Sequence, residues 1–331
     1  MIAKKNVQPS RLSILKRIKV ALRQDHSVVL HRLGRNVTKV FLPAYFASES
    51  FLRLRDFEHC VECSLSVYKE DIAATDDVHV PEAYTPLRGF KQIFFENEDS
   101  CKPATGFNLS GLRYQIWYKK SGNMVIIAFR GTRFSRPQDW YANFRWVTRF
   151  IPGVNDYYSQ VQALIPHLVE HLRSKFGEKL TILTTGHSLG GGLAQHAAYC
   201  SEHISIVHAF APTPVTGYFS VPKAEREKNK KNTIIVRSFE HGEILAYLRF
   251  FMRRLVMLSA VNPEINELRF NASRLPPVTS HSMARMAKHL RRCLKEARVL
   301  SEPNIAHVLA DTSSKSISNK SNSSQKEEIH S

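Results

Sequence analysis

The chain has 331 residues and a hydrophobic content of 43%, enough for one large α/β domain or for two small ones. Its longest apolar run, residues 244–261, contains three arginines and is therefore excluded as a membrane span. The formal net charge of +18 attracts phosphate, on lipid headgroups or on nucleic acid, and does not by itself choose between these partners.

The N-terminal segment, residues 1–56, is basic and partly helical by its pattern. Its first 24 residues carry seven basic residues and no acidic one. Apolar residues recur between these charges at helical spacing: Leu12, Leu15, Ile18 and Leu22. The pattern predicts an amphipathic helix that lies on an anionic membrane, acts as a transit peptide or packs on the domain. It lacks the apolar core of a secretory signal, so we expect a cytoplasmic protein or one exported without a signal, with peripheral membrane association.

Residues 112–118 and 124–129 predict two strands around a turn. The second strand runs into Gly131 and Thr132, and Thr132 offers a backbone N–H and a hydroxyl to an oxygen that becomes negative. Aromatic residues crowd positions 134–158, and Phe134 is the candidate for a substrate-binding wall because it follows this turn directly.

Two patterns look like metal sites but lack further ligands. Cys60 and Cys63 form a C-x-x-C without a second pair, which indicates ordinary thiols in a reducing compartment. Residues 167–171 read H-x-x-E-H, yet the apolar stripe of a sheet-covering helix runs through them, from Val161 to a predicted end near Gly177. No metal and no organic cofactor is expected.

Residues 184–192 contain G-x-S-x-G between an apolar run, 180–183, and a small-residue helical pattern. A serine on such a strand–turn–helix corner has strained backbone dihedrals and is lifted clear of its neighbours. Small residues flank it because strand and helix nearly collide, a demand that Gly186 and Gly190 meet. We therefore predict that Ser188 is a nucleophile and that the Leu189 N–H donates to the oxyanion.

Strands predicted at 205–210 and 234–239 complete a mainly parallel sheet covered on both faces. An activated serine needs a base and an acid that orients it. Two carboxylates follow the last strand, Glu240 and Glu243, and local sequence does not separate them. His281 follows two prolines and precedes a helical stretch, a loop position suited to a general base.

The remaining segments are basic or polar. Residues 220–232 are rich in lysine and predict a surface loop. Residues 244–261 predict a helix that meets lipid or packs on the sheet, and a basic run from Arg285 to Arg298 either holds phosphate headgroups or forms a solvated helix face. Residues 301–331 predict a disordered polar tail, which leaves 57–300 for the domain.

Three stretches together resemble the class 3 lipase family of α/β-hydrolases: Ala128–Thr132, Asp139-Trp140 and Thr185–Gly191. The triple glycine, Gly106-Phe107 and Gly242–Leu245 resemble its bacterial phospholipase-like or effector-lipase branch. The resemblance spans about residues 105–290 and departs from the family where an aspartate followed by an apolar pair and proline would stand, because Glu243 occupies that place. It favours Glu243 over Glu240, and it implies an oxyanion hole at Thr132 and Leu189 and substrates that are esters of long-chain acids.

These observations predict an α/β-hydrolase fold, a mainly parallel central sheet with helices on both faces. We expect a serine hydrolase that cleaves lipid esters of the lipase or phospholipase A type through Ser188, His281 and Glu243 and an acyl-enzyme. The expected partners are a lipid or phospholipid substrate and an anionic membrane surface, with no nucleic acid. The alternatives are an acyltransferase on the same triad and a catalytically silent membrane-binding protein of the same fold.

Overall fold

The structure is a computed structural model. It describes residues 28–47, 57–68, 90–93, 112–131, 157–252, 258–271 and 276–301. Among these residues no helix is both long enough and apolar enough to cross a membrane.

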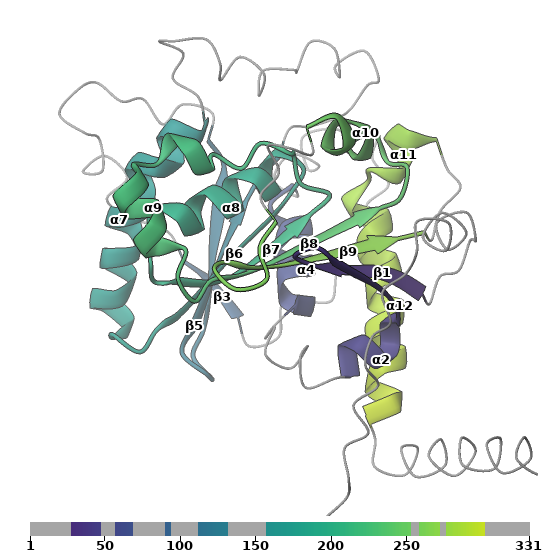
Figure 1. The fold of residues 1–331 in the computed structure, drawn as a ribbon. Helices are drawn as coiled ribbons and strands as arrows, with labels where there is room; N and C mark the ends of the chain where they lie inside the picture. The colour runs from purple at the N-terminus through teal and green to yellow at the C-terminus, as the bar shows by residue number, and fades with distance from the viewer. Residues whose placement is uncertain are drawn as a thin grey trace, which may run out of the picture.

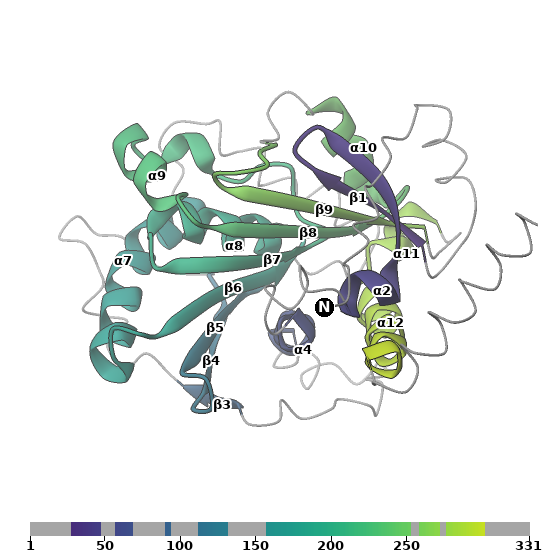
Figure 2. The ribbon, with the colours of Figure 1, turned by 60° about the horizontal axis from the view of Figure 1, so that its bottom comes forward.

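The described strands form one nine-stranded sheet in the order β2-β1-β9-β8-β7-β6-β5-β4-β3. They are β1 (Val28–Leu33), β2 (Asn36–Phe41), β3 (Phe90–Ile93), β4 (Tyr114–Lys119), β5 (Met124–Phe129), β6 (Thr181–His187), β7 (Ile204–Phe210), β8 (Ile234–Glu240) and β9 (Glu264–Phe270). The neighbours from β5 to β9 pair in parallel, and the strands at both edges pair antiparallel. Figure 2 shows the strands from β9 to β3 in this succession.

Strand β5 shows why the sheet needs cover on both faces. All six of its residues are buried, and alternate residues contribute to two separate hydrophobic clusters. One cluster takes Val125, Ile127 and Phe129, and the other takes Met124, Ile126 and Ala128. Side chains alternate across a strand, so a parallel strand that is apolar throughout requires an apolar layer on each side.

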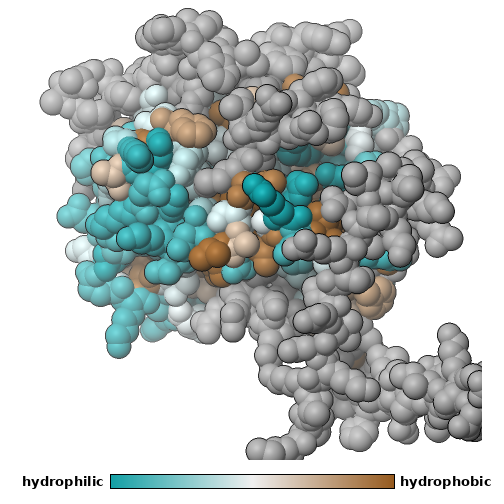
Figure 3. All heavy atoms as spheres, in the orientation of Figure 1, coloured by the Kyte–Doolittle hydropathy of each residue, from teal (hydrophilic) through white to brown (hydrophobic). Residues whose placement is uncertain are grey.

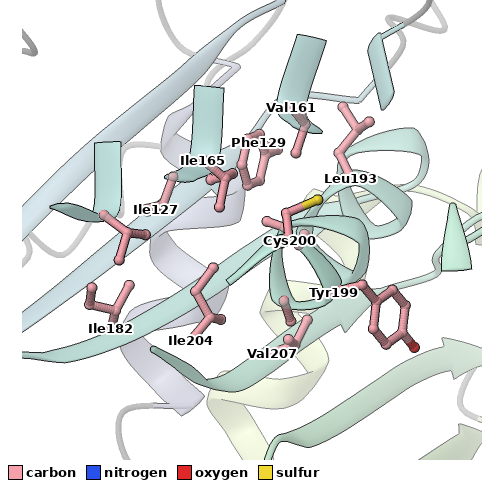
Figure 4. Close-up of a cluster of buried hydrophobic side chains, with 14 of the residues drawn as sticks. Ile127, Phe129, Val161, Ile165, Ile182, Leu193, Tyr199, Cys200, Ile204 and Val207 are labelled. Atoms are coloured by element: carbon pink, nitrogen blue, oxygen red, sulfur yellow. The ribbon is translucent and has the colours of Figure 1, made fainter. Parts of the chain in front are cut away.

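Helices supply these two layers (Figure 1). One face carries α7 (Tyr157–Phe176), α8 (Leu189–Cys200) and α9 (Lys223–Asn229). The other face carries α2 (Leu42–Ala47), α4 (Phe57–Ser66) and α12 (Met283–Ser301). Figure 4 shows the first layer, in which side chains of α7 and α8 pack against β5, β6 and β7. This arrangement confirms the predicted α/β-hydrolase fold class.

The strands predicted within 112–239 are observed as β4 to β8, but three parts of the fold differ from the expectation. The lysine-rich segment expected as a loop contains the helix α9, whose described surface is mainly hydrophilic (Figure 3). Strand β9 was not predicted. The hairpin of β1 and β2 lies within the segment 1–56 and extends the sheet beyond the predicted domain boundary at residue 57, because β1 pairs with β9. The predicted N-terminal helix and the polar tail after Ser301 lie outside the described residues.

Candidate active site

Ser188 lies on the turn between β6 and α8, as the G-x-S-x-G pattern predicts. Its backbone dihedrals are φ 58° and ψ −123°, a strained combination for a residue with a side chain. The Ser188 N–H donates to the carbonyl of Phe210 at 2.9 Å, and this bond ties the turn to the end of the neighbouring strand. Sharp turns of this kind present a serine hydroxyl at the carboxyl edge of a sheet.

Glycines make this turn sterically possible. A Cβ on Gly186 would lie 2.4 Å from the carbonyl carbon of Gly190, and a Cβ on Gly190 would lie 2.2 Å from the carbonyl oxygen of Phe129. The opposing atoms belong to the backbone and cannot swing away as a side chain could. The first turn of α8 therefore packs directly on β5 and β6 only because these positions lack a side chain.

The two candidate oxyanion donors differ in how far the structure describes them. Leu189 is the first residue of α8, where a backbone N–H has no partner within the helix and the helix dipole is positive. Thr132 lies outside the described residues, and so does Phe134. The preceding Gly131 donates its N–H to the Tyr68 hydroxyl at 3.0 Å, and a Cβ there would lie 2.3 Å from the His187 carbonyl oxygen. The backbone at Gly131, just after β5, is thus in close contact with the serine turn.

The structure brings Glu243 and His281 together. Glu243 precedes α10 (Ile244–Phe251), and His281 lies between α11 (Pro277–Ser280) and α12. The Nδ1 atom of His281 is 2.7 Å from Oε2 of Glu243, and both side chains are buried. A carboxylate can only accept, so Nδ1 carries the proton and Nε2 is the basic nitrogen. Figure 1 shows α10 and α11 next to each other.

The other candidate acid, Glu240, ends β8 and is also buried. Gly242, with a φ of 74°, turns the chain after it, and the carboxylate that reaches His281 is that of Glu243. Of the two carboxylates that local sequence left open, Glu243 is therefore the one in contact with the candidate base.

His187 connects the serine turn to the histidine loop. Its Nε2 lies 2.7 Å from the carbonyl oxygen of His281, and the two ring centroids are 4.7 Å apart. The carbonyl accepts, so Nε2 carries the proton, and Nδ1 faces the Tyr68 hydroxyl at 3.5 Å. Burial, together with the nearby His281, holds the pKa of His187 well below its usual value, so this ring stays neutral. Ser188 follows directly, so the loop of His281 is held at the serine turn. Sequence analysis gave His187 and Tyr68 no role.

Burial and the Arg249 guanidinium lower the pKa of His281 from 6.5 to about 3. The imidazole is therefore neutral at neutral pH, the state that a general base requires. Arg249 donates to the Glu243 carboxylate and is itself buried. The sequence shows Arg249 only as one of three arginines in an apolar run, which is a weak signal.

The H-x-x-E-H pattern lies on α7. On α7 the side chains of His167 and Glu170 are exposed. Within the described residues, no group of three or more His, Cys, Asp or Glu side chains is arranged to hold a metal ion.

The sequence profile of the Tle-like phospholipase domain matches residues 63–284, about two thirds of the chain. No curated protein sequence matches the chain. Among solved structures, a triacylglycerol lipase from Penicillium expansum is 15% identical, with 63% of this chain and 77% of that chain covered and a TM-score of 0.37. A Rhizomucor miehei triacylglyceride lipase is 17% identical, with 66% and 77% covered and a TM-score of 0.40. At these scores the solved lipases carry no argument about the chemistry of this chain.

Proposed function

Because the chain belongs to the Tle-like phospholipase family, we propose that it hydrolyses carboxylic esters of lipids through Ser188, His281, Glu243 and an acyl-enzyme. The observation that carries this proposal is the 2.7 Å hydrogen bond between buried Glu243 and His281, whose loop His187 ties to the serine turn. Acyl transfer requires a serine nucleophile and a neutral imidazole that a carboxylate orients, and the residue before Ser188 contacts the loop that carries this imidazole.

The reaction follows from this arrangement. The Ser188 oxygen attacks the ester carbonyl carbon while its proton passes to Nε2 of His281. The N–H groups of Leu189 and Thr132 stabilise the oxyanion of the tetrahedral intermediate. The intermediate then expels the alcohol, which takes the proton from His281, and the acyl group stays on Ser188. Water attacks the acyl-enzyme, gives its proton to His281 and releases the fatty acid, and the proton returns to Ser188.

Phospholipid is the substrate that the family and the charge favour. Five cations lie exposed along α12, whose first residue, Met283, follows His281 by two positions: Arg285, Lys288, Arg292, Lys295 and Arg298, the last paired with Glu58. An exposed stripe of this sign attracts an anionic membrane surface. Phe134 remains our candidate for the wall that contacts the acyl chain.

The test is a panel of liposomes with zwitterionic and anionic headgroups, incubated with the wild-type protein and with Ser188→Ala. We expect fatty acid release by the wild type and a loss of at least about 10³-fold in the variant, because the nucleophile is removed. Ser220→Ala replaces an exposed serine and should retain the wild-type rate. Labelling with a fluorophosphonate should modify the wild type and Ser220→Ala but not Ser188→Ala.

The same panel separates the alternatives. Transfer of the acyl group to an added alcohol in preference to water would indicate an acyltransferase. Equal behaviour of the wild type and Ser188→Ala on every ester, with no fluorophosphonate adduct, would remove the hydrolase proposal and leave a silent membrane-binding protein.

A further inference from the structure

Arg249 is a buried cation with three partners: a carboxylate, a backbone carbonyl and an aromatic ring. Its guanidinium donates to Oε1 of Glu243 and to the carbonyl oxygen of Pro212, the latter at 2.5 Å. The guanidinium carbon also lies 4.2 Å from the centroid of the Phe239 ring. The side chain is 9% exposed, so its charge needs these partners. A planar guanidinium can serve a carboxylate and a carbonyl at once and stack on a ring, which an ammonium cannot do in the same geometry.

These contacts divide the Glu243 carboxylate between two sets of donors. Oε1 accepts from Arg249, whereas Oε2 accepts from the Leu245 N–H at 2.9 Å and from Nδ1 of His281 at 2.7 Å. Arg249 therefore sets the rotation of the carboxylate about its terminal bond, because it occupies the oxygen that faces away from the imidazole. Loss of the guanidinium would allow the carboxylate to turn away from Nδ1.

Arg249 also changes the charge balance at His281. An ionised carboxylate alone favours the imidazolium, but a carboxylate already paired with a guanidinium favours it less, since the second cation repels it. Among the described residues, the other charged groups near Arg249 are Glu267 and Arg269 on β9 and Arg237 on β8, and the titratable ring of His187 faces His281. Glu267 is engaged by Arg237 at 3.3 Å, so the closest counter-charge to Arg249 is Glu243.

We propose that Arg249 is a positioning residue of the site: it orients the Glu243 carboxylate toward Nδ1 of His281 and places a second positive charge beside that pair. The proposal rests on the triad of the proposed function and adds to it a fourth residue that touches no substrate. Without the Arg249 guanidinium, His281 would become protonated, and so stop acting as a base, at a higher pH than in the wild type.

The test measures the rate of fluorophosphonate labelling of Ser188 from pH 3 to pH 9. Labelling requires unprotonated His281, whose pKa of about 3 places the acidic limb of the wild-type profile in strongly acidic solution. Arg249→Gln removes the repelling charge, so His281 takes up a proton more readily and the acidic limb should move up by at least about one pH unit. Arg249→Lys keeps the positive charge but loses the planar guanidinium that bonds two acceptors. The acidic limb of its profile should lie at the same pH as in the wild type, while its plateau labelling rate falls roughly tenfold.

Arg269→Gln is the matched control, because Arg269 also lies over the Phe239 ring, at 5.8 Å, but belongs to the Glu267 group. Its limb should match that of the wild type. A uniform loss of rate in Arg249→Gln, with the limb unmoved, would show a merely structural role and overturn the inference while Ser188-dependent labelling upholds the proposed function. If Arg249→Gln does not fold, Arg249→Lys decides: an unchanged plateau rate, or a limb displaced upward, contradicts the inference. Absence of labelling in the wild type would instead contradict the proposed function.

Discussion

The serine turn contacts the loop of His281 through His187, but the turn and the proposed acid–base region of Glu243 and His281 are held by different interactions. Around Ser188, backbone atoms of β5, β6 and α8 approach so closely that a single added carbon at Gly190 would lie 2.2 Å from an oxygen. Around Glu243 and His281, the contacts are hydrogen bonds among buried charged and titratable groups. Steric contact tolerates almost no displacement, whereas a polar network depends on every member being present. The two regions should therefore fail in different ways when they are altered.

The largest effect is expected in the acid–base region. Glu243→Gln keeps the size of the side chain but leaves Arg249 without its counter-charge and offers His281 no carboxylate. The imidazole loses the partner that fixes its tautomer, so kcat should fall by about 10³- to 10⁴-fold in a lipid hydrolysis assay. Glu240→Gln is the control, and we expect it to retain most of the activity. A larger loss in Glu240→Gln than in Glu243→Gln would reverse the assignment of the acid.

The next effect concerns the serine turn, where folding rather than chemistry should suffer. Gly190→Ala would force a Cβ against the backbone of β5, at the carbonyl oxygen of Phe129, and should cost at least about 3 kcal/mol of the free energy of unfolding. Gly191→Ala is a graded comparison, because its nearest atom would lie at 3.0 Å and the expected cost is about 1 kcal/mol. Urea denaturation measures both. Equal stabilities would mean that the turn yields more readily than its contacts indicate.

The smallest effect is expected where the two regions join. His187→Phe keeps a ring but removes the N–H that the His281 carbonyl accepts, so the histidine loop should sit less firmly at the serine turn. We expect kcat/KM to fall roughly tenfold, the scale set by one lost hydrogen bond to a buried carbonyl. His289→Phe provides the control, since His289 packs on Phe270 and lies on α12. Wild-type kinetics in His187→Phe would show that the loops hold their places independently.

The same contrast explains what could be predicted from the sequence. The serine turn was predictable because its steric demand requires glycines at fixed spacings within a few residues. The choice between Glu240 and Glu243 could not be made from local sequence, because Glu243 contacts His281, a residue 38 positions away; the family resemblance alone favoured Glu243. The role that we propose for Arg249 could not be predicted either. Its contact with the carboxylate six residues before it depends on the fold, as does its contact with the carbonyl 37 residues before it.

Two of the three parts of the fold that differ from the expectation were missed for similar reasons. Helix α9 lies in a lysine-rich stretch that predicts a loop, yet Glu227 accepts from the Tyr218 hydroxyl at 2.6 Å and Arg226 lies over the Tyr218 ring. The edge hairpin sits in a basic segment, and its contacts with β9, such as His31 with Asn266, span 235 residues. Tertiary contact overrode local composition in both places.

The pairing of β1 with β9 has a consequence for the order in which a growing chain matures. A ribosome releases the N-terminal hairpin long before the strand that receives it, and the hydroxyl of Ser188 emerges well ahead of the imidazole at position 281. Until α12 leaves the exit tunnel, the nascent polypeptide carries Ser188 without the histidine that we propose as its base. Synthesis itself thus delays assembly of the proposed site, and a chain released early, before residue 264, would lack both its sheet edge and its proposed base.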